Sequence, residues 1–133
     1  MIAIDKLCKA FGGKVVLQDF SCEMEEGRVT ALMAPSGAGK TTLLRILMGL
    51  ETADSGEITG LSGKWLAAVF QEDRLLPWYT AEENLALALG GMDVARMWLE
   101  RLRLSDAGKR YPDELSGGMR RRVSLARALG FPI

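Results

Sequence analysis

The sequence contains no histidine, only two cysteines and four prolines, and no excess charge of either sign. Without histidine, no imidazole is available to any reaction of this chain. Lysine and arginine together number 17, as do aspartate and glutamate, which argues against general binding to nucleic acid or anionic membranes. Cys8 and Cys22 stand in strand-like, apolar settings without metal-ligand spacing, so we expect two buried thiols.

Long apolar runs are also missing. Stretches such as Leu85–Leu89 are much too short to span a bilayer, so we expect a soluble chain with at most a peripheral role at a membrane. With 133 residues and 48% hydrophobic composition, the chain is long enough to form one ordinary core.

A glycine-rich run, Ala34–Thr41 (APSGAGKT), lies between a short apolar stretch, Val29–Met33, and a helical pattern, Thr42–Gly49. This strand, loop and helix order is the context of a phosphate-binding loop, because glycines let backbone N–H groups converge on a polyphosphate at the positive end of a helix. We expect Lys40 to neutralise the β- and γ-phosphates and Thr41 to place its hydroxyl on Mg²⁺. The other predicted nucleotide contacts are Ala34, Pro35, Ser36, Gly37, Ala38, Gly39 and Thr42.

The loop departs from the pattern G-x-x-x-x-G-K-[ST] at its first position, which is Ala34 instead of glycine. If this residue needed a positive φ, alanine would cost about 1 kcal/mol, whereas a strand-like backbone would tolerate it. We expect the strand-like case. The alternative for the whole run is a chance glycine-rich turn before a core helix.

A second glycine motif, Leu115–Met119 (LSGGM), opens the helical pattern Met119–Leu129. Ser116 is a natural N-cap, and the exposed N–H groups of Gly117 and Gly118 would form a second anion site at the helix start. By itself, such a cap would more often be only a turn. Within this helix Met119, Val123 and Ala126 should share one face, with Gly130 and Pro132 as stop signals.

The two motifs, followed by Arg120–Leu129 (RRRVSLARAL), resemble the ATP-binding subunit of an ABC transporter, and the resemblance covers the whole chain. Phe11 occupies the place of the aromatic residue that stacks on adenine, and Gln71 that of the Q-loop glutamine. Arg122 and Arg127 match the arginines of the signature helix.

The stretch Val69–Leu85 (VFQEDRLLPWYTAEENL) is similar to the importer branch that serves nitrate, sulfonate and taurine-like substrates. The resemblance implies ATP and Mg²⁺ as cofactors, and Lys40 and Gln71 as catalytic residues. Thr41 and Gln71 would meet Mg²⁺ through the nucleotide. A second ATPase subunit, closing head to tail, would receive contacts in trans from Ser116, Gly117, Gly118 and Met119, although Met119 replaces the family's usual glutamine.

The implied partners also include a transmembrane permease subunit and no nucleic acid. The chain would then lie on the cytoplasmic, inner face of the cell membrane. The apolar loop Leu75–Tyr79 would receive the permease, or else Trp78 and Tyr79 would pack the two subdomains together.

The implied fold is α/β: a P-loop NTPase core with an N-terminal antiparallel β-layer and a helical subdomain. We expect the β-layer over residues 1–27, the P-loop core over 28–72, and the Q-loop, helical subdomain and signature helix over 73–133. Within these, the patterns predict strands at Ile2–Leu7, Val15–Met24, Glu57–Thr59 and Lys64–Phe70, and a turn at Gly12–Gly13. A capping box of Thr80 and Glu83 should open a helix to about Leu89, and Asp93 a second through Leu102.

The sequence ends at Ile133, where the resembled family begins the strand that carries the Mg²⁺-binding aspartate and the catalytic glutamate. We therefore expect a fold that is incomplete at the C-terminus. Since hydrolysis needs a group that orients the attacking water, we expect weak nucleotide binding with little or no turnover.

Three other functions compete with this interpretation. A small P-loop kinase could use Glu72 and Asp73 after the apolar run Leu66–Phe70, but it would leave the LSGGM motif without a role. A DNA-repair or chromosome-organising ATPase would need a long coiled coil between the two motifs, and no sustained heptads occur there. A truncated, non-catalytic module that binds nucleotide or a partner is the third.

Overall fold

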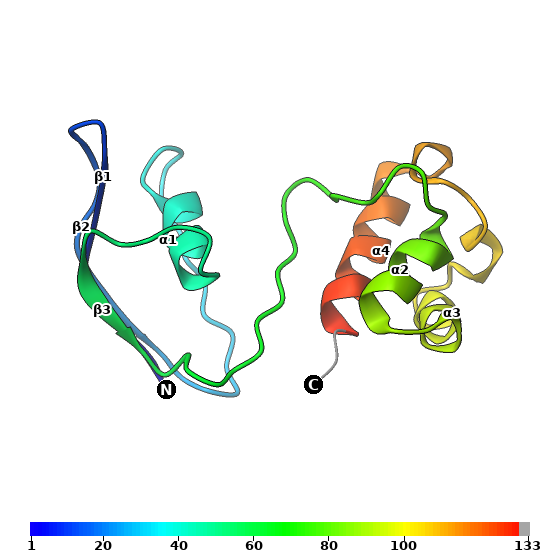
Figure 1. Cartoon of the computed structure of the whole chain (residues 1–133), viewed down its shortest axis with the longest axis horizontal. Coiled ribbons are helices and arrows are strands. Elements are labelled where there is room, and N and C mark those ends of the chain that lie inside the picture. Colours follow the sequence, from blue (N-terminus) through cyan, green and yellow to red (C-terminus); the bar gives the residue numbers. More distant parts are fainter. Residues whose placement is uncertain (131–133) are drawn as a thin grey trace. The chain divides into compact units, whose positions relative to one another are not determined.

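The computed structural model describes residues 1–130 and divides the chain into two compact units, Met1–Lys64 and the residues from Trp65 onward. The predicted stop signal Pro132 lies outside the described residues. Each unit has its own core, and the two differ in class: the first is a small α/β layer and the second is helical (Figure 1). The finer boundaries expected after residues 27 and 72 stay predictions.

The sheet of the first unit has three antiparallel strands in the order β2-β1-β3: β1 (Ile2–Phe11), β2 (Lys14–Met24) and β3 (Ser55–Thr59). The predicted hairpin is confirmed, including its turn at Gly12 and Gly13, whose φ angles of 54° and 84° favour glycine. The sheet is thus the expected N-terminal β-layer.

Helix α1 (Lys40–Leu47) packs against this sheet, and Leu43 and Ile46 are its buried residues. Leu44, which shares the predicted apolar pattern, is exposed instead. The other buried members of this core are Ile4, Leu7 and Leu17, with Phe20, Cys22 and Met24 around them as the alternation of the strand predicts.

The expectation of two buried thiols is wrong, because Cys8 and Cys22 are both only half-buried. The Cys8 sulfur instead lies near a strand irregularity, where it accepts a hydrogen bond from the N–H of Asp19 over 3.3 Å. Cys22 packs at the margin of the α1 core, and Cys8 does not belong to that core.

Two predicted strands, Val29–Met33 and Lys64–Phe70, are irregular chain in the structure. A parallel strand needs neighbouring strands to satisfy its N–H and C=O groups, and the sheet formed within residues 1–130 contains only β1, β2 and β3. Consequently Val29 is 99% exposed and Met33 is 89% exposed. The glycine loop therefore follows an unpaired segment and not a strand.

The second unit contains helices α2 (Ala81–Leu89), α3 (Met92–Arg101) and α4 (Gly117–Leu129) and the short 3₁₀ helices η1 (Ser105–Ala107) and η2 (Pro112–Glu114) (Figure 1). The predicted capping box is confirmed: Thr80 Oγ1 accepts from the Glu83 N–H, and the Glu83 carboxylate accepts from the Thr80 N–H. Helix α3 begins one residue before the expected Asp93.

The core of this unit joins all three helices. It consists of Leu75, Ala81, Leu85, Leu89, Ala95, Leu99, Leu104, Ala107, Leu115, Val123 and Ala126. None of the helices within residues 1–130 is both long enough and apolar enough to cross a membrane.

Candidate nucleotide-binding site

The glycine loop between Ala34 and α1 takes its shape from two left-handed glycines. Gly37 has φ 82° and Gly39 has φ 90°. A Cβ atom at Gly39 would lie 2.8 Å from the carbonyl oxygen of Val16, so the loop can approach β2 this closely only with glycine. Ala34 has no positive φ, so the costly case for alanine does not apply, although the residue lies in irregular chain and not in a strand; the non-glycine residues with positive φ in the described chain are Lys6, Asp19, Arg74 and Arg103.

The first turn of α1 has backbone N–H groups that no described side chain caps, at the positive end of the helix dipole. Gly39 occupies the N-cap position, and within residues 1–130 no side chain caps this turn and no acidic residue lies in it. The backbone N–H groups at a helix start and the helix dipole both attract an anion. The predicted loop residues Pro35, Ser36, Gly37 and Ala38 are all exposed around this position.

Lys40, the first residue of α1, reaches back across the loop and donates a hydrogen bond to the carbonyl oxygen of Ala34. The loop is closed by a turn in which the Ala38 N–H donates to the Pro35 carbonyl over 3.2 Å. The ammonium group therefore lies on the same short loop as the uncapped amides. One ammonium group and several neutral backbone N–H donors, none of them paired with a carboxylate of the described chain, fit a polyphosphate.

A metal ion would depend on that polyphosphate. Thr41 is exposed on the first turn of α1 and Thr42 is half-buried beside it. In the described part of the chain, no group of three or more histidine, cysteine, aspartate or glutamate side chains could hold a metal. The Thr41 hydroxyl suits Mg²⁺ only as one ligand beside phosphate oxygens and water.

Phe11 lies at the same end of the first unit as the loop. It ends β1 opposite Lys14, and two residues further along β2 is Val16, which contacts Gly39. The Phe11 ring is exposed, and the Lys9 ammonium lies 5.1 Å from its centroid. The structure thus brings the predicted adenine contact and the predicted phosphate contacts to one end of the sheet.

An ion-pair cluster fixes the strand that carries Phe11. Lys9 pairs with Glu51 and with Asp54, each over 3.3 Å, and Asp54 also accepts the Ala10 N–H over 2.8 Å. The Ala10 N–H, followed by the Lys9 ammonium, holds the pKa of Asp54 below its ordinary value. Desolvation opposes the charge of Lys9, but its hydrogen bonds to the two carboxylates raise the pKa of Lys9.

The second predicted anion site lies at the start of α4 in the second unit. Ser116 is the N-cap, as predicted, and its Oγ accepts the Met119 N–H over 3.1 Å. Ser116, Gly117 and Gly118 are exposed, whereas Met119 packs against the core. The predicted helix face is confirmed, since Val123 and Ala126 are fully buried. An apolar methionine suits this packing position.

Gln71 is exposed and lies in an irregular segment. The residues just after it form hydrogen bonds with side chains of α4. Two residues later, the Asp73 carboxylate accepts from Arg120 Nε over 3.1 Å, and the Asp73 carbonyl accepts from Arg127 over 2.7 Å. Arg127 also donates to the Arg74 carbonyl over 2.9 Å. Burial lowers the pKa of Arg127, and the Asp73 charge offsets part of this effect. Arg122, the other predicted signature arginine, donates to the Leu102 carbonyl over 3.1 Å.

Sequence reasoning missed the pairing of Asp73 with Arg120. They lie 47 residues apart, so no local spacing connects them. It also missed Asn84, which is 3% exposed and holds the apolar loop Leu75–Tyr79. Asn84 accepts the Leu76 N–H over 2.8 Å and donates to the carbonyls of Leu76, Tyr79 and Thr80. A signal for Asn84 was present, because it is the polar residue between Ala81 and Leu85 on the buried face of a helix.

The same loop presents an apolar side chain to solvent. Trp78 is 65% exposed, although Leu75 at the other end of the loop is buried in the helical core. The hydrogen bonds of Asn84 therefore hold a loop that begins in the helical core at Leu75 and exposes Trp78 to solvent.

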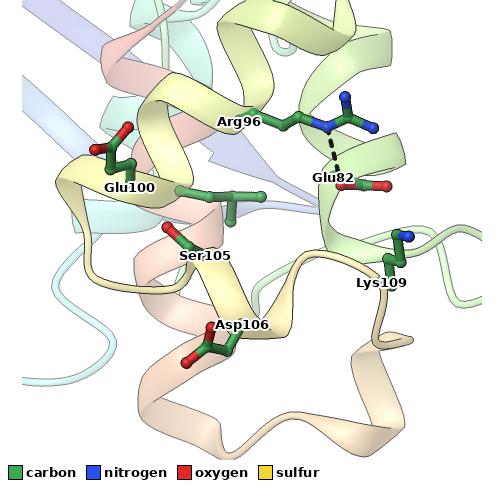
Figure 2. A pocket seen from close by; sticks show the side chains of 7 residues that line it. Glu82, Arg96, Glu100, Ser105, Asp106 and Lys109 are labelled. Carbon is green, nitrogen blue, oxygen red and sulfur yellow. Dashed lines mark hydrogen bonds and ion pairs between the residues drawn. The ribbon is translucent and has the colours of Figure 1, made fainter.

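A pocket of about 560 Å³ lies between α2, α3 and η1, and contains none of the predicted site residues (Figure 2). Leu99 forms its apolar part. Arg96 Nε lies 3.5 Å from the Glu82 carboxylate across one side of it. The other lining residues are Glu100, Ser105, Asp106 and Lys109.

A glycine loop with a lysine at the head of a helix, together with a serine-capped glycine motif at the head of another, defines a P-loop nucleotide-binding domain with a signature helix. The sequence matches the ABC transporter family over residues 17–130. The chain therefore belongs to the ABC transporter family, which decides against a small P-loop kinase.

Two curated relatives illustrate the branch. The chain is 43% identical to the "Aliphatic sulfonates import ATP-binding protein SsuB 1" of Pseudomonas savastanoi pv. phaseolicola, over 96% of this chain and 54% of the relative. It is 39% identical to the "Taurine import ATP-binding protein TauB" of Escherichia coli O157:H7, over 97% of this chain and 56% of the relative. The chain thus spans about half the length of the curated relatives it matches. The expected similarity to the sulfonate and taurine branch is confirmed.

Among solved structures, the chain is similar to the ATP-binding cassette MJ0796, a dimer in a post-hydrolysis state bound to ADP and Pi. The TM-score is 0.83 at 27% identity, and the match covers 98% of this chain and 69% of the other. The α/β cassette fold predicted from the sequence is confirmed.

Proposed function

We propose that this chain is the ATP-binding part of an ABC importer, and that its glycine loop binds the phosphates of ATP together with Mg²⁺. The observation that carries the proposal is the uncapped start of α1, with Lys40 directed across the loop at Ala34. The import functions printed for the sulfonate and taurine relatives support an importer of that substrate class.

Each predicted residue has a role in this proposal. Lys40 exchanges the Ala34 carbonyl for β- and γ-phosphate oxygens, and the loop amides donate to the same anion. Phe11 stacks on adenine at the exposed tip of the hairpin, and Thr41 supplies one ligand to Mg²⁺. Gln71 senses the γ-phosphate and the metal.

The partners of the proposal are a second ATPase subunit and a transmembrane permease. Ser116, Gly117 and Gly118 cap the γ-phosphate held by the second subunit, which their exposure at the start of α4 supports. The exposed Trp78 at the tip of its loop supports docking to the permease rather than packing within the chain. The chain would then lie on the cytoplasmic face of the membrane.

A second proposal concerns ATP hydrolysis by these 133 residues alone. They contain no histidine, and within residues 1–130 the first turn of α1 has no acidic residue. We propose that the chain as given binds nucleotide without appreciable hydrolysis, because nothing on the loop orients an attacking water.

Calorimetric titration with Mg²⁺ and ATP tests the binding proposal. Lys40→Ala should weaken binding by about 100-fold or more, because it removes charge-assisted hydrogen bonds to the phosphates. Lys109→Ala is the matched control, since it removes an exposed lysine in the other unit and should leave the affinity unchanged. Equal affinity of all three proteins would refute the assignment. Steady phosphate release by the unmodified chain would refute the proposed lack of turnover.

A further inference from the structure

Three charged residues of the second unit, here called the Asp73 cluster, link the segment after Gln71 to helix α4: Asp73, Arg120 and Arg127. The Arg120 and Asp73 side chains are only 34% and 28% exposed, whereas those of the surface pair Arg28 and Glu25 are 76% and 65% exposed. Water and salt screen a half-buried pair less than an exposed one. The cluster is therefore suited to fix the position of the segment after Gln71 relative to helix α4.

Arg120 connects the segment after Gln71 with the residues that precede Ser116. Besides pairing with Asp73, its guanidinium donates to the Leu115 carbonyl over 2.8 Å and to the Pro112 carbonyl over 3.3 Å. Leu115 directly precedes Ser116, and Asp73 follows Gln71 by two residues. A planar guanidinium with five donors can hold several acceptors in one arrangement, which a lysine could not.

The Arg127 side chain holds the same segment by hydrogen bonds to the backbone carbonyls of that segment. It donates to the carbonyls of Asp73 and Arg74, and Arg74 has the left-handed φ of 52°. The Arg74 guanidinium in turn lies 3.9 Å from the centroid of the Phe70 ring. A non-glycine residue keeps this conformation only where its surroundings hold it. The turn after Gln71 is thus fixed on both sides.

We propose that the Asp73 cluster positions Gln71 relative to Ser116, so that the two move as one body. This inference rests on the proposed function for its consequence: Gln71 meets the nucleotide of its own subunit, and Ser116 meets that of the second subunit. A displacement of Gln71 on nucleotide binding would then be transmitted to the cap over the other ATP. Asp73, Arg120 and Arg127 are positioning residues and do not contact nucleotide themselves.

The test measures the distance between the two segments without nucleotide. Nitroxide labels are placed at Glu72→Cys and Arg121→Cys, both exposed positions, in a full chain with Cys8→Ser and Cys22→Ser. Asp73→Asn keeps the acceptor for the Leu75 N–H but turns an amide toward Arg120. Electron paramagnetic resonance should show the distance distribution broadened by about two-fold.

Glu82→Gln is the matched control, because it changes the acid of another arginine pair in the same unit and should leave the distribution narrow. Arg127→Lys keeps the charge but cannot hold both carbonyls, and should broaden it as Asp73→Asn does. This variant decides the matter if Asp73→Asn does not fold. Distance distributions of equal width in the unmodified chain, Arg127→Lys and Glu82→Gln would overturn the inference. A cluster variant that has a lowered urea midpoint but no broader distance distribution would also overturn it. If the unmodified chain fails to bind ATP, the proposed function fails, but the distances still decide the role of the cluster.

Discussion

The substitution Gly39→Ala tests whether the glycine loop is held in its observed shape by close packing on β2. An alanine at φ 90° costs about 1–2 kcal/mol for its left-handed backbone. The added Cβ would also lie 2.8 Å from the Val16 carbonyl oxygen and 3.0 Å from two side-chain carbons of Val16 and Leu17. Because the nearest atom belongs to the backbone of β2, a rotamer change cannot relieve the contact.

Overpacking of this kind costs about 1–3 kcal/mol, so Gly39→Ala should destabilise the first unit by about 2–5 kcal/mol in total. Gly37→Ala is the matched control. Its φ of 82° is nearly the same, but a Cβ there meets nothing within 4 Å. The control should therefore cost only the backbone part, about 1–2 kcal/mol.

Urea unfolding followed by two-dimensional NMR would measure this difference, because it reads the resonances of each unit separately. The three tryptophans, Trp65, Trp78 and Trp98, all belong to the second unit, so their fluorescence should report an unchanged midpoint. ATP affinity should fall more in Gly39→Ala than in Gly37→Ala, since only the former displaces the amides at the head of α1. Equal destabilisation by the two variants would refute the argument.

Two further predictions concern stability. Asn84→Leu should destabilise the second unit by about 2–4 kcal/mol, because it removes the acceptor of the Leu76 N–H and one donor to each of the Leu76, Tyr79 and Thr80 carbonyls. Urea unfolding followed by tryptophan fluorescence would show it, and a change within about 0.5 kcal/mol would contradict it. Stability should stay level between about pH 5.5 and 8, since the chain has no histidine, and decline below about pH 4. The pKa values of Asp54 and Glu51 are lowered on folding, so their contribution is lost as the pH falls through those lowered values. Thermal melts at stepwise pH would test this, and a midpoint that rises on acidification would refute it.

Local sequence determined most elements of this protein. The hairpin turn at Gly12 and Gly13, the capping box of Thr80 and Glu83 and the N-cap at Ser116 are all formed as predicted. Each depends on a backbone preference or a hydrogen bond between residues at most three positions apart, so a short stretch of sequence suffices to specify it. The left-handed φ angles of Gly37 and Gly39 belong to the same class, whereas the close approach of Gly39 to Val16 of β2 is a tertiary contact.

Only the tertiary structure decided which apolar segments become strands and which charges meet. Val29–Met33 and Lys64–Phe70 have strand-like sequences, yet neither joins the three-stranded sheet, because a strand is stabilised by neighbours that its own sequence cannot supply. Likewise Asp73 and Arg120 are ordinary charged residues until the fold of the second unit brings them within 3.1 Å. Contacts between distant residues depend on chain topology, and that is why the glycine turn before α1 could be predicted from the sequence whereas the Asp73 cluster could not.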